Sequence, residues 1–163
     1  MVAMIEIIQA DLSQTRHASA LVELLDAYAR DPMGGGQPLA ESTRRNLAAE
    51  LHKRQDAVSF LAFAGERPVG LVNCFEGFST FNCRPLLNIH DVVVLDGYRG
   101  QGIARQLLQQ VEAHARARGC CKLTLEVLEG NRPAQAAYLS AGFAGYELDP
   151  VTGRALFWEK KLD

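Results

Sequence analysis

The stretch Arg99-Gly100-Gln101-Gly102-Ile103-Ala104 decides the fold, and it opens an apolar stripe with helical spacing. Glycine has no side chain, so a charged group can approach the backbone closely, and consecutive amides at a helix N-terminus point their hydrogens toward it. Arg99 and Arg105 add positive charge on either side. The stretch therefore indicates a cradle for a phosphate or pyrophosphate, although glycines before a helix are also common as plain turn formers.

Two familiar nucleotide-binding loops fit this stretch badly. It lacks the Gly-Lys-Ser or Gly-Lys-Thr ending of a Walker loop. It also lacks the Gly-x-Gly-x-x-Gly pattern followed by an acidic strand end that dinucleotide-binding folds use. The cradle therefore suits a different nucleotide.

Regular elements are predicted on both sides of the glycine stretch. Before it, Leu86–Leu95 is almost continuously apolar, as in a central strand covered on both faces. After it, an apolar stripe predicts a helix that stops at Gly119. A strand over Lys122–Leu128 and a short helix between Asn131 and Gly142 follow. This strand-helix-strand-helix order requires a sheet that is partly parallel.

The rest of the chain alternates between strand and helix patterns. The helix that contains Ala18 and Ala29 should stop at Asp31-Pro32, because the residue before a proline is pushed out of the helical region. The other expected elements are a strand Met4–Gln9, a loop Met33–Pro38, a helix Ala40–Arg54, a hairpin of Val58–Ala64 with Val69–Phe78, and a last hairpin of Phe143–Leu148 with Ala155–Leu162.

Composition and charge restrict the class of protein. The 163 residues are 48% hydrophobic and 22% charged, which is ordinary globular composition and predicts one folded domain over residues 1–163. The net charge of −2 provides no strong basic field, so we expect no nucleic-acid partner. Positive charge is instead local: residues 96–122 carry five basic and two acidic side chains, a net charge of +3.

Cysteine usage and hydropathy indicate the compartment. The four cysteines have no metal-ligand spacing, so we expect no metal site, and a domain of this size does not need disulfides. No window approaches eighteen consecutive apolar residues, so no membrane anchor is expected. These observations predict a cytoplasmic protein with reduced thiols.

With the segment that follows it, the glycine stretch resembles the GNAT superfamily of acetyl-CoA-dependent N-acetyltransferases. That family's signature is Arg or Gln, two residues, Gly, one residue, then Gly or Ala, and residues 99–104 match it throughout. A second family element is a strand followed by an Asn, a Tyr seven residues later and then Gly-Phe, which Asn131, Tyr138 and Gly142-Phe143 match. The resemblance covers residues 86–143 and implies the GNAT fold, an α/β fold. Its central sheet is mixed and mostly antiparallel, with parallel, splayed fourth and fifth strands and about four flanking helices.

The resemblance also implies acetyl-CoA as cosubstrate, without a metal. Three valines of the central strand would pair by backbone with the pantetheine arm as an extra strand does. Residues 99–105 would hold the pyrophosphate, and the Tyr138 hydroxyl would lie near the thioester sulfur. Asn131 also fits a helix N-cap, and Tyr138 also fits a core aromatic. The implied cofactor-binding residues are Val92, Val93, Val94, Arg99, Gly100, Gln101, Gly102, Ile103, Ala104, Arg105, Asn131 and Tyr138.

Two titratable residues in the central strand are candidates for the chemistry. Acetyl transfer requires a neutral amine, whereas an alkylammonium has a pKa near about 10, so a base must accept its proton. Imidazole titrates nearest neutrality, which makes His90 the first choice, with Asp91 orienting the ammonium or acting as the base itself. Neighbours in a regular strand point to opposite faces, so a bulge is needed for both to reach one cavity. The alternative is that His90 is a core histidine bonded to a backbone carbonyl.

Other residues complete the expected chemistry. Glu126 is the next candidate base, with a surface position or a buried salt bridge as its alternative. The oxyanion needs a donor, most simply a backbone N–H near Val92, and Tyr138 would give a proton to the leaving thiolate. Cys120 and Cys121 lie in no motif position, and they fit small buried hydrophobes better than a covalent acetyl-cysteine route.

The resemblance therefore implies an enzyme that transfers acetyl from acetyl-CoA to a primary amine of a small molecule by direct attack in a ternary complex. Two other functions stay open, namely acetylation of a protein or peptide amine and CoA binding without catalysis. The acceptor pocket would be built from the first two helices and the loop Met33–Pro38. A homodimer also stays open, with Ala155–Leu162 as an edge strand, although Glu159, Lys160 and Lys161 would discourage open-ended pairing.

Overall fold

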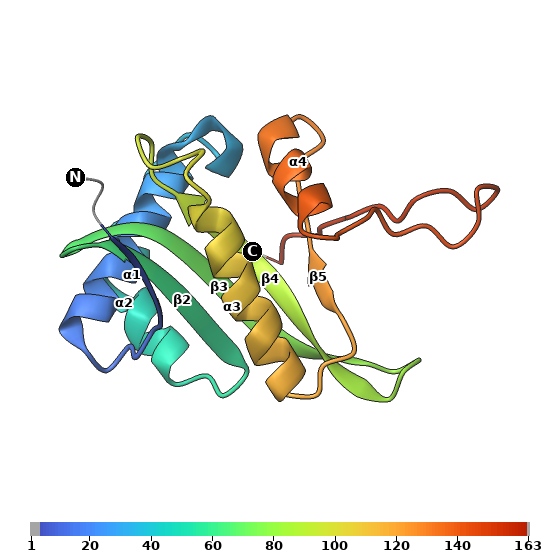
Figure 1. The fold of residues 1–163 in the computed structure, drawn as a ribbon, viewed down its shortest axis with the longest axis horizontal. Helices are drawn as coiled ribbons and strands as arrows, with labels where there is room; N and C mark the ends of the chain where they lie inside the picture. Colours follow the sequence, from blue (N-terminus) through green and yellow to red (C-terminus); the bar gives the residue numbers. More distant parts are fainter. Residues whose placement is uncertain (1–3, 163) are drawn as a thin grey trace.

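One mixed sheet organises the protein, and a computed structural model describes residues 4–162 (Figure 1). The strands pair in the order β1-β2-β3-β4-β5, antiparallel except for the parallel pair β4–β5. The predicted fold class is therefore confirmed. The strands are β1 (Ile5–Gln9), β2 (Ala57–Ala64), β3 (Arg67–Ser79), β4 (Arg84–Val94) and β5 (Leu123–Leu125). Among the described residues the helices are α1 (Thr15–Arg30), the 3₁₀ helix η1 (Pro32–Gly34), α2 (Glu41–His52), α3 (Ile103–Ala117) and α4 (Arg132–Ser140).

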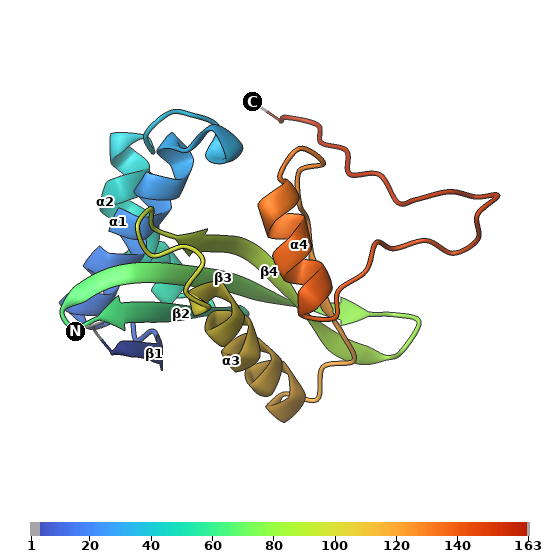
Figure 2. The same ribbon diagram turned by 45° about the horizontal axis from the view of Figure 1, so that its top comes forward.

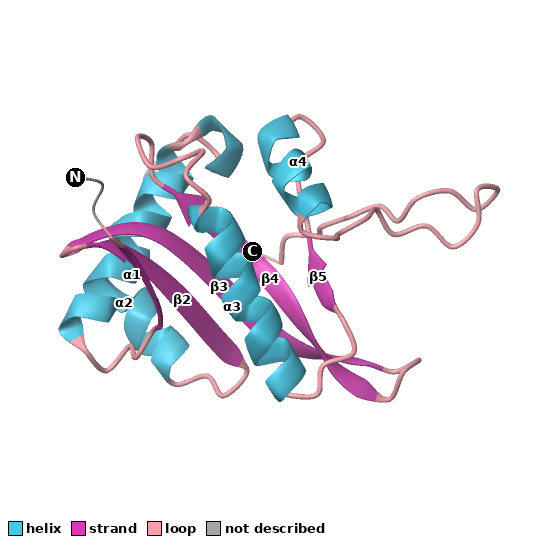
Figure 3. Cartoon of the chain, viewed as in Figure 1, coloured by secondary structure: helices cyan, strands magenta, loops and turns pink. Residues whose placement is uncertain are grey.

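Helices cover both faces of the sheet (Figures 2 and 3). On one face, α1 buries Leu21 and Leu24 against Leu61, Phe63 and Leu71 of the sheet. On the other face, an apolar stripe of α3 packs on the alternate side chains of β2, β3 and β4. The alternation of buried side chains along the strands therefore forms two cores, one under α1 and one under α3.

Helix α1 ends, as predicted, at its C-cap Asp31, the residue before Pro32. Asp31 has a ψ of 143°, outside the helical region, and Pro32 begins η1. The Asp31 carboxylate accepts the Met33 N–H at 2.9 Å, and the Asp26 carboxylate accepts the Leu39 N–H at 2.9 Å. Two carboxylates therefore hold the backbone of the loop that was expected to be irregular.

Gly70 on β3 allows α3 to lie close to the sheet. A Cβ built at Gly70 would lie 3.1 Å from the side chains of both Ile103 and Leu107. The missing side chain brings the first turn of α3 against the C-terminal half of β4, because Gly70 pairs with Val94. The position of the glycine stretch over the sheet depends on this close approach.

Two predictions near the C-terminus need correction. The strand expected over Lys122–Leu128 is only Leu123–Leu125, because its pairing with β4 stops there. The last hairpin of Phe143–Leu148 with Ala155–Leu162 is wrong: the described residues contain one isolated bridge there, between Glu147 and Arg154, and no strand. Neither segment of the expected hairpin pairs with the outer edge of β5, and they extend away from the body as an arm (Figure 1).

Candidate active site

The parallel strands β4 and β5 separate after a short pairing. Their register runs only from Leu87 with Leu123 to Ile89 with Leu125. The Asn88 side chain donates from Nδ2 to Thr124 Oγ1 at 3.0 Å across this pair. Beyond it, His90–Val94 of β4 pairs with β3 alone. The sheet therefore has an opening on the β5 side of β4.

The backbone of β4 presents alternate residues to this opening. The Leu95 N–H donates to Val69 O at 2.9 Å, so alternation along an antiparallel pair turns the polar groups of Val93 toward β3 and those of Val92 and Val94 toward the opening. Arg99 Nε donates to Val94 O at 3.0 Å from that side. Of the three valines expected to bind pantetheine, Val92 and Val94 thus have the required backbone orientation. Val93 does not, and its side chain is buried under α1.

The glycine stretch ends at the N-terminus of α3 as expected. Gly102 is the N-cap with a φ of 78°, a left-handed conformation that favours glycine, and no side chain caps this end of the helix. The first-turn amides of Ile103, Ala104 and Arg105 have no partner within the helix. An uncapped N-terminus with a positive dipole end fits a pyrophosphate group.

Arg99 is engaged in contacts that the sequence did not indicate. Its guanidinium lies 2.8 Å from Asp96 Oδ1 and 3.4 Å from Asp31 Oδ2. The Asp31 carboxylate has a pKa below its usual range because it accepts the Met33 N–H and interacts with Arg99. Arg99 therefore links the end of α1 to the loop before α3, and these carboxylates would compete with a pyrophosphate for its charge.

A bulge in β4 brings His90 and Asp91 to one face. Asn73 of β3 pairs with Asp91, whereas the next residue, Cys74, pairs with Ile89, so His90 is the extra residue. Ile89 and Val92 both pack into the core under α3. His90 and Asp91, which lie between them, therefore both point to the α1 face. A bulge was the condition for both side chains to reach one cavity.

His90 is exposed and lies edge-on to the Phe75 ring, with ring centroids 5.3 Å apart. Its alternative interpretation as a core histidine is therefore wrong. An exposed imidazole on the α1 face is accessible to an acceptor and to water, as a base must be.

Asp91 is the end of a polar chain that starts inside the sheet. Ser59 Oγ donates to Asn73 Oδ1 at 2.6 Å, and Asn73 Nδ2 donates to Asp91 Oδ2 at 3.0 Å. Ser59 and Asn73 are buried. Sequence reasoning missed both residues, although Asn73 is the polar exception in the apolar run Leu71–Phe75.

Tyr138 and Asn131 occupy the two ends of α4. Asn131 is the N-cap and accepts the Ala134 N–H at 3.3 Å, which confirms the capping interpretation. Tyr138 packs on the α3-side core with its ring centroid 6.0 Å from that of Phe143. Burial, and to a smaller degree the Tyr28 phenol, raise the pKa of Tyr138, so its hydroxyl keeps its proton at neutral pH.

Tyr28 of α1 is a further aromatic residue that the sequence did not single out. Its pKa is raised first by burial and then by the charges of Asp91 and Asp31. Tyr28 is therefore coupled by charge to Asp91 on β4 and to Tyr138 on α4. The three side chains come from three different elements.

The remaining chemical candidates are Glu126 and the two adjacent cysteines. Glu126 directly follows Leu125, which pairs with Ile89, and it is exposed as His90 is, so its role as a base stays a prediction. Burial raises the pKa of the Cys120 thiol, which disfavours the thiolate that an acetyl-cysteine route needs. Within residues 4–162, no cluster of His, Cys, Asp or Glu could hold a metal ion, and no helix is long and apolar enough to cross a membrane.

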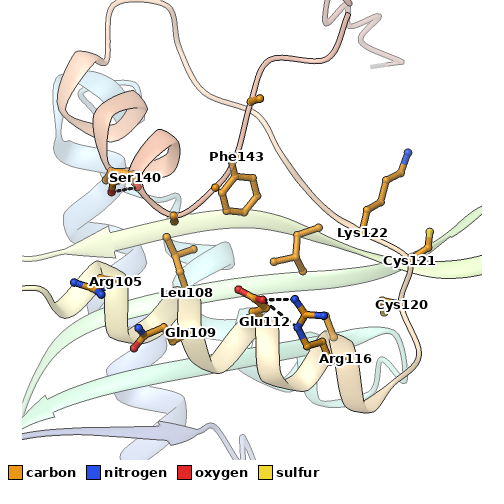
Figure 4. A pocket seen from close by; sticks show the side chains of 16 residues that line it. Arg105, Leu108, Gln109, Glu112, Arg116, Cys120, Cys121, Lys122, Ser140 and Phe143 are labelled. Atoms are coloured by element: carbon orange, nitrogen blue, oxygen red, sulfur yellow. Dashed lines mark hydrogen bonds and ion pairs between the residues drawn. The ribbon is translucent and has the colours of Figure 1, made fainter. Parts of the chain in front are cut away.

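A groove of about 570 Å³ lies beside β5, between α3 and the end of α4 (Figure 4). Leu108 and Phe143 line it from opposite sides, and Arg116 and Lys122 add charge at one end. Arg105 is the predicted site residue that borders it. The groove therefore adjoins the expected pyrophosphate site and does not contain His90 or Asp91.

Comparison with known proteins matches residues 18–143 to the acetyltransferase (GNAT) family. The streptothricin acetyltransferase of Streptomyces lavendulae is 44% identical over 72 residues, which are 44% of this chain and 37% of that protein. The thialysine N-epsilon-acetyltransferase of Caenorhabditis elegans is 33% identical over 96 residues, 57% of this chain and 59% of that protein. The chain thus spans less than two thirds of the length of these relatives.

A solved structure extends the likeness in fold to nearly the whole chain. An aminoglycoside N-acetyltransferase in complex with CoA matches with a TM-score of 0.74 and 20% identity, over 97% of this chain and 95% of that one. At this identity the match concerns the fold.

Proposed function

Because the chain belongs to the acetyltransferase (GNAT) family, we propose that it transfers an acetyl group from acetyl-CoA to a primary amine of a small molecule. The observation that carries the proposal is the opening beside β4, where one bulge turns His90 and Asp91 to the same face. The streptothricin and thialysine N-epsilon acetyltransferases that the chain resembles support a small amine as acceptor.

The chain's own groups fit acetyl-CoA. Val92 and Val94 offer backbone groups along the opening, and the uncapped N-terminus of α3 offers amides for the pyrophosphate. Asn131 and Tyr138 lie near the two ends of α4, and by their positions in the family motif they would contact the cofactor arm. When bound, acetyl-CoA supplies an activated acetyl thioester in which attack by nitrogen forms a C–N bond and breaks the C–S bond.

Two side chains carry the proton transfers, and a third orients the substrate. His90 accepts the proton of the attacking amine, directly or through water, and Asp91 orients the ammonium beforehand. The Val92 N–H, directed to the opening, donates to the acetyl carbonyl oxygen. Tyr138, which holds its proton at neutral pH, gives it to the leaving thiolate. The acetyl group passes directly to the amine, without an acyl-enzyme.

Thiol release from acetyl-CoA tests this function. We would measure it with streptothricin, thialysine and kanamycin as amines and with a peptide carrying a free N-terminus, and measure CoA binding by thermal shift. Release with at least one small amine is expected. Thiol release with the peptide alone would show that the acceptor is a protein or peptide amine. CoA binding without thiol release from any amine would show a CoA-binding module without catalysis.

We also propose a homodimer in which the arm, residues 144–162, covers the open edge of β5 in a second copy. Seven large apolar side chains of the arm are exposed: Tyr146, Leu148, Val151, Leu156, Phe157, Trp158 and Leu162. The groove beside β5 is lined by the apolar side chains of Leu108, Leu123 and Phe143, which the apolar side chains of the arm would cover. Light scattering after size exclusion should give twice the chain mass; a monomer at micromolar concentration overturns the dimer.

A cytoplasmic location belongs to the same proposal. The four cysteines are free thiols, one of them exposed, and reducing compartments keep such thiols unpaired.

A further inference from the structure

A buried hydrogen-bonded chain connects the interior of the sheet to the candidate site. It runs from Ser59 on β2 through Asn73 on β3 to Asp91 at the bulge of β4, with donor–acceptor distances of 2.6 and 3.0 Å. Ser59 is 6% exposed and Asn73 is 3% exposed, whereas Asp91 is half-buried. Only the last group of the chain can therefore reach a substrate.

The chemistry of the three side chains determines which group donates and which accepts in each hydrogen bond. Ser59 donates its hydroxyl hydrogen to the amide oxygen of Asn73, which leaves the amide NH₂ for Asp91. An ionised carboxylate can only accept, so the opposite amide orientation would set two acceptors against each other. The side chain of Asn73 is buried, and an unmade hydrogen bond of its oxygen or nitrogen would therefore destabilise the fold more than one at the surface.

We propose that Asn73 is a positioning residue that holds Asp91 Oδ2 and thereby directs Asp91 Oδ1 to the acceptor, which binds there as an ammonium. The inference rests on the proposed transfer to a primary amine and deepens it. Asp91 binds the cation, and the neighbouring His90 then takes its proton. The two roles that the sequence left open for Asp91 are thus reduced to one.

The surroundings of Asp91 fit a binding carboxylate. His90 lies on the same face, and the charge of Asp91 is one of the causes that raise the pKa of Tyr28 on α1. Asp31 adds a second negative charge near Tyr28 and is paired with Arg99. Among residues 4–162, no lysine or arginine forms an ion pair with Asp91. Its charge therefore stays available to a cationic acceptor.

Asn73→Leu tests the inference, because leucine has a similar volume and no donor. With the amine that the wild type turns over fastest in the panel, KM for the amine should rise about 10- to 50-fold, the effect of losing a hydrogen bond to a charged group. Turnover at saturating amine and the Kd for CoA should change less than about 3-fold, because Asn73 contacts neither reacting group.

Asp91→Asn is the matched partner in a double-mutant cycle. If Asn73 acts through Asp91, then Asn73→Leu adds less than about 2-fold to the KM of the Asp91→Asn variant. Independent, multiplicative effects would overturn the positioning role. Hydroxylamine, a nucleophile that is uncharged at pH 7.5, should show the same KM in the wild type and in Asn73→Leu; an equal rise for both nucleophiles would also overturn it.

Ser59→Ala covers the case in which Asn73→Leu does not fold, as judged by thermal unfolding. It frees the amide to rotate, so KM for the amine should rise about 2- to 5-fold, the range for a neutral hydrogen bond. An unchanged KM in every folded variant overturns the inference while the proposed function stands. Absence of turnover in the wild type would instead overturn the proposed function, and this inference with it.

Discussion

The two halves of β4 differ in what lies beside them. In the first half, Leu87–Ile89 has β3 on one side and β5 on the other, whereas His90–Val94 has β3 alone. The first half has the surroundings of a central strand, and the second half has a free edge and the candidate chemical groups. One continuous strand can therefore serve as scaffold and as binding edge, and the bulge at His90 marks the change.

The largest expected effect concerns Tyr138, the proposed proton donor to the leaving thiolate. Tyr138→Phe removes the hydroxyl and keeps the ring against Phe143, so turnover should fall about 10²- to 10³-fold, as expected for loss of a general acid. Steady-state kinetics give turnover, and titration gives the Kd for CoA, which should not change. Unchanged turnover at saturating substrates would remove Tyr138 from the chemistry.

Proline substitutions at two adjacent positions test the two edges of β4 independently. Val93→Pro removes an N–H directed at β3 and should lower the free energy of unfolding by about 3 kcal/mol or more. Val94→Pro removes an N–H directed at the opening, so the fold should survive while the affinity for CoA falls about 10-fold. Chemical denaturation and CoA titration measure the two effects, and equal destabilisation by both prolines would contradict the assigned edges.

His90→Gln tests the residue at the boundary between the halves. Glutamine forms hydrogen bonds but cannot accept the proton of the amine, so turnover should fall about 10²-fold. The measurement is turnover from pH 5 to pH 9 with saturating acetyl-CoA. Phe75→Leu, which removes the ring beside His90 but no titrating group, is the control and should keep the wild-type profile.

The smallest expected effect concerns the paired half. Asn88→Ala removes the hydrogen bond to Thr124 Oγ1 and should lower the free energy of unfolding by about 1 kcal/mol. Thr124→Val removes the other partner. Since both changes break one bond, the double variant should be about as stable as the weaker single variant. Additive losses in a urea melt would mean that this bond does not join the two strands.

Local chemistry was sufficient to predict the elements that depend on near neighbours in the chain. Asp31-Pro32 ends a helix by steric exclusion, and the Gly102 N-cap opens one by its freedom at positive φ. The family resemblance on residues 86–143 added the sheet and the region of the site. That residues 1–163 form one domain, and the roles of the site residues, stay predictions.

Contacts between distant parts of the chain were beyond sequence reasoning. The bulge was recognised as a requirement, but its position depends on the register between β3 and β4. The partners of Asn73 and Arg99 come from other elements, so no spacing indicates them. The last hairpin was wrong because an alternating pattern does not show whether a segment pairs with a neighbouring strand: residues 143–162 form one isolated bridge and leave the outer edge of β5 unpaired.

The short pairing of β5 also determines where the molecule opens under thermal motion. Three residue pairs join β5 to β4, whereas ten join β3 to β4, so local unfolding that detaches β5 exposes far less buried structure than any opening of the other strands. The amide hydrogens that pair β5 with β4 should therefore exchange with deuterium before those that join β2, β3 and β4. A ligand that forms hydrogen bonds to both β4 and β5 would stabilise their pairing. It would slow the amide exchange of β5, and the more so the higher its affinity.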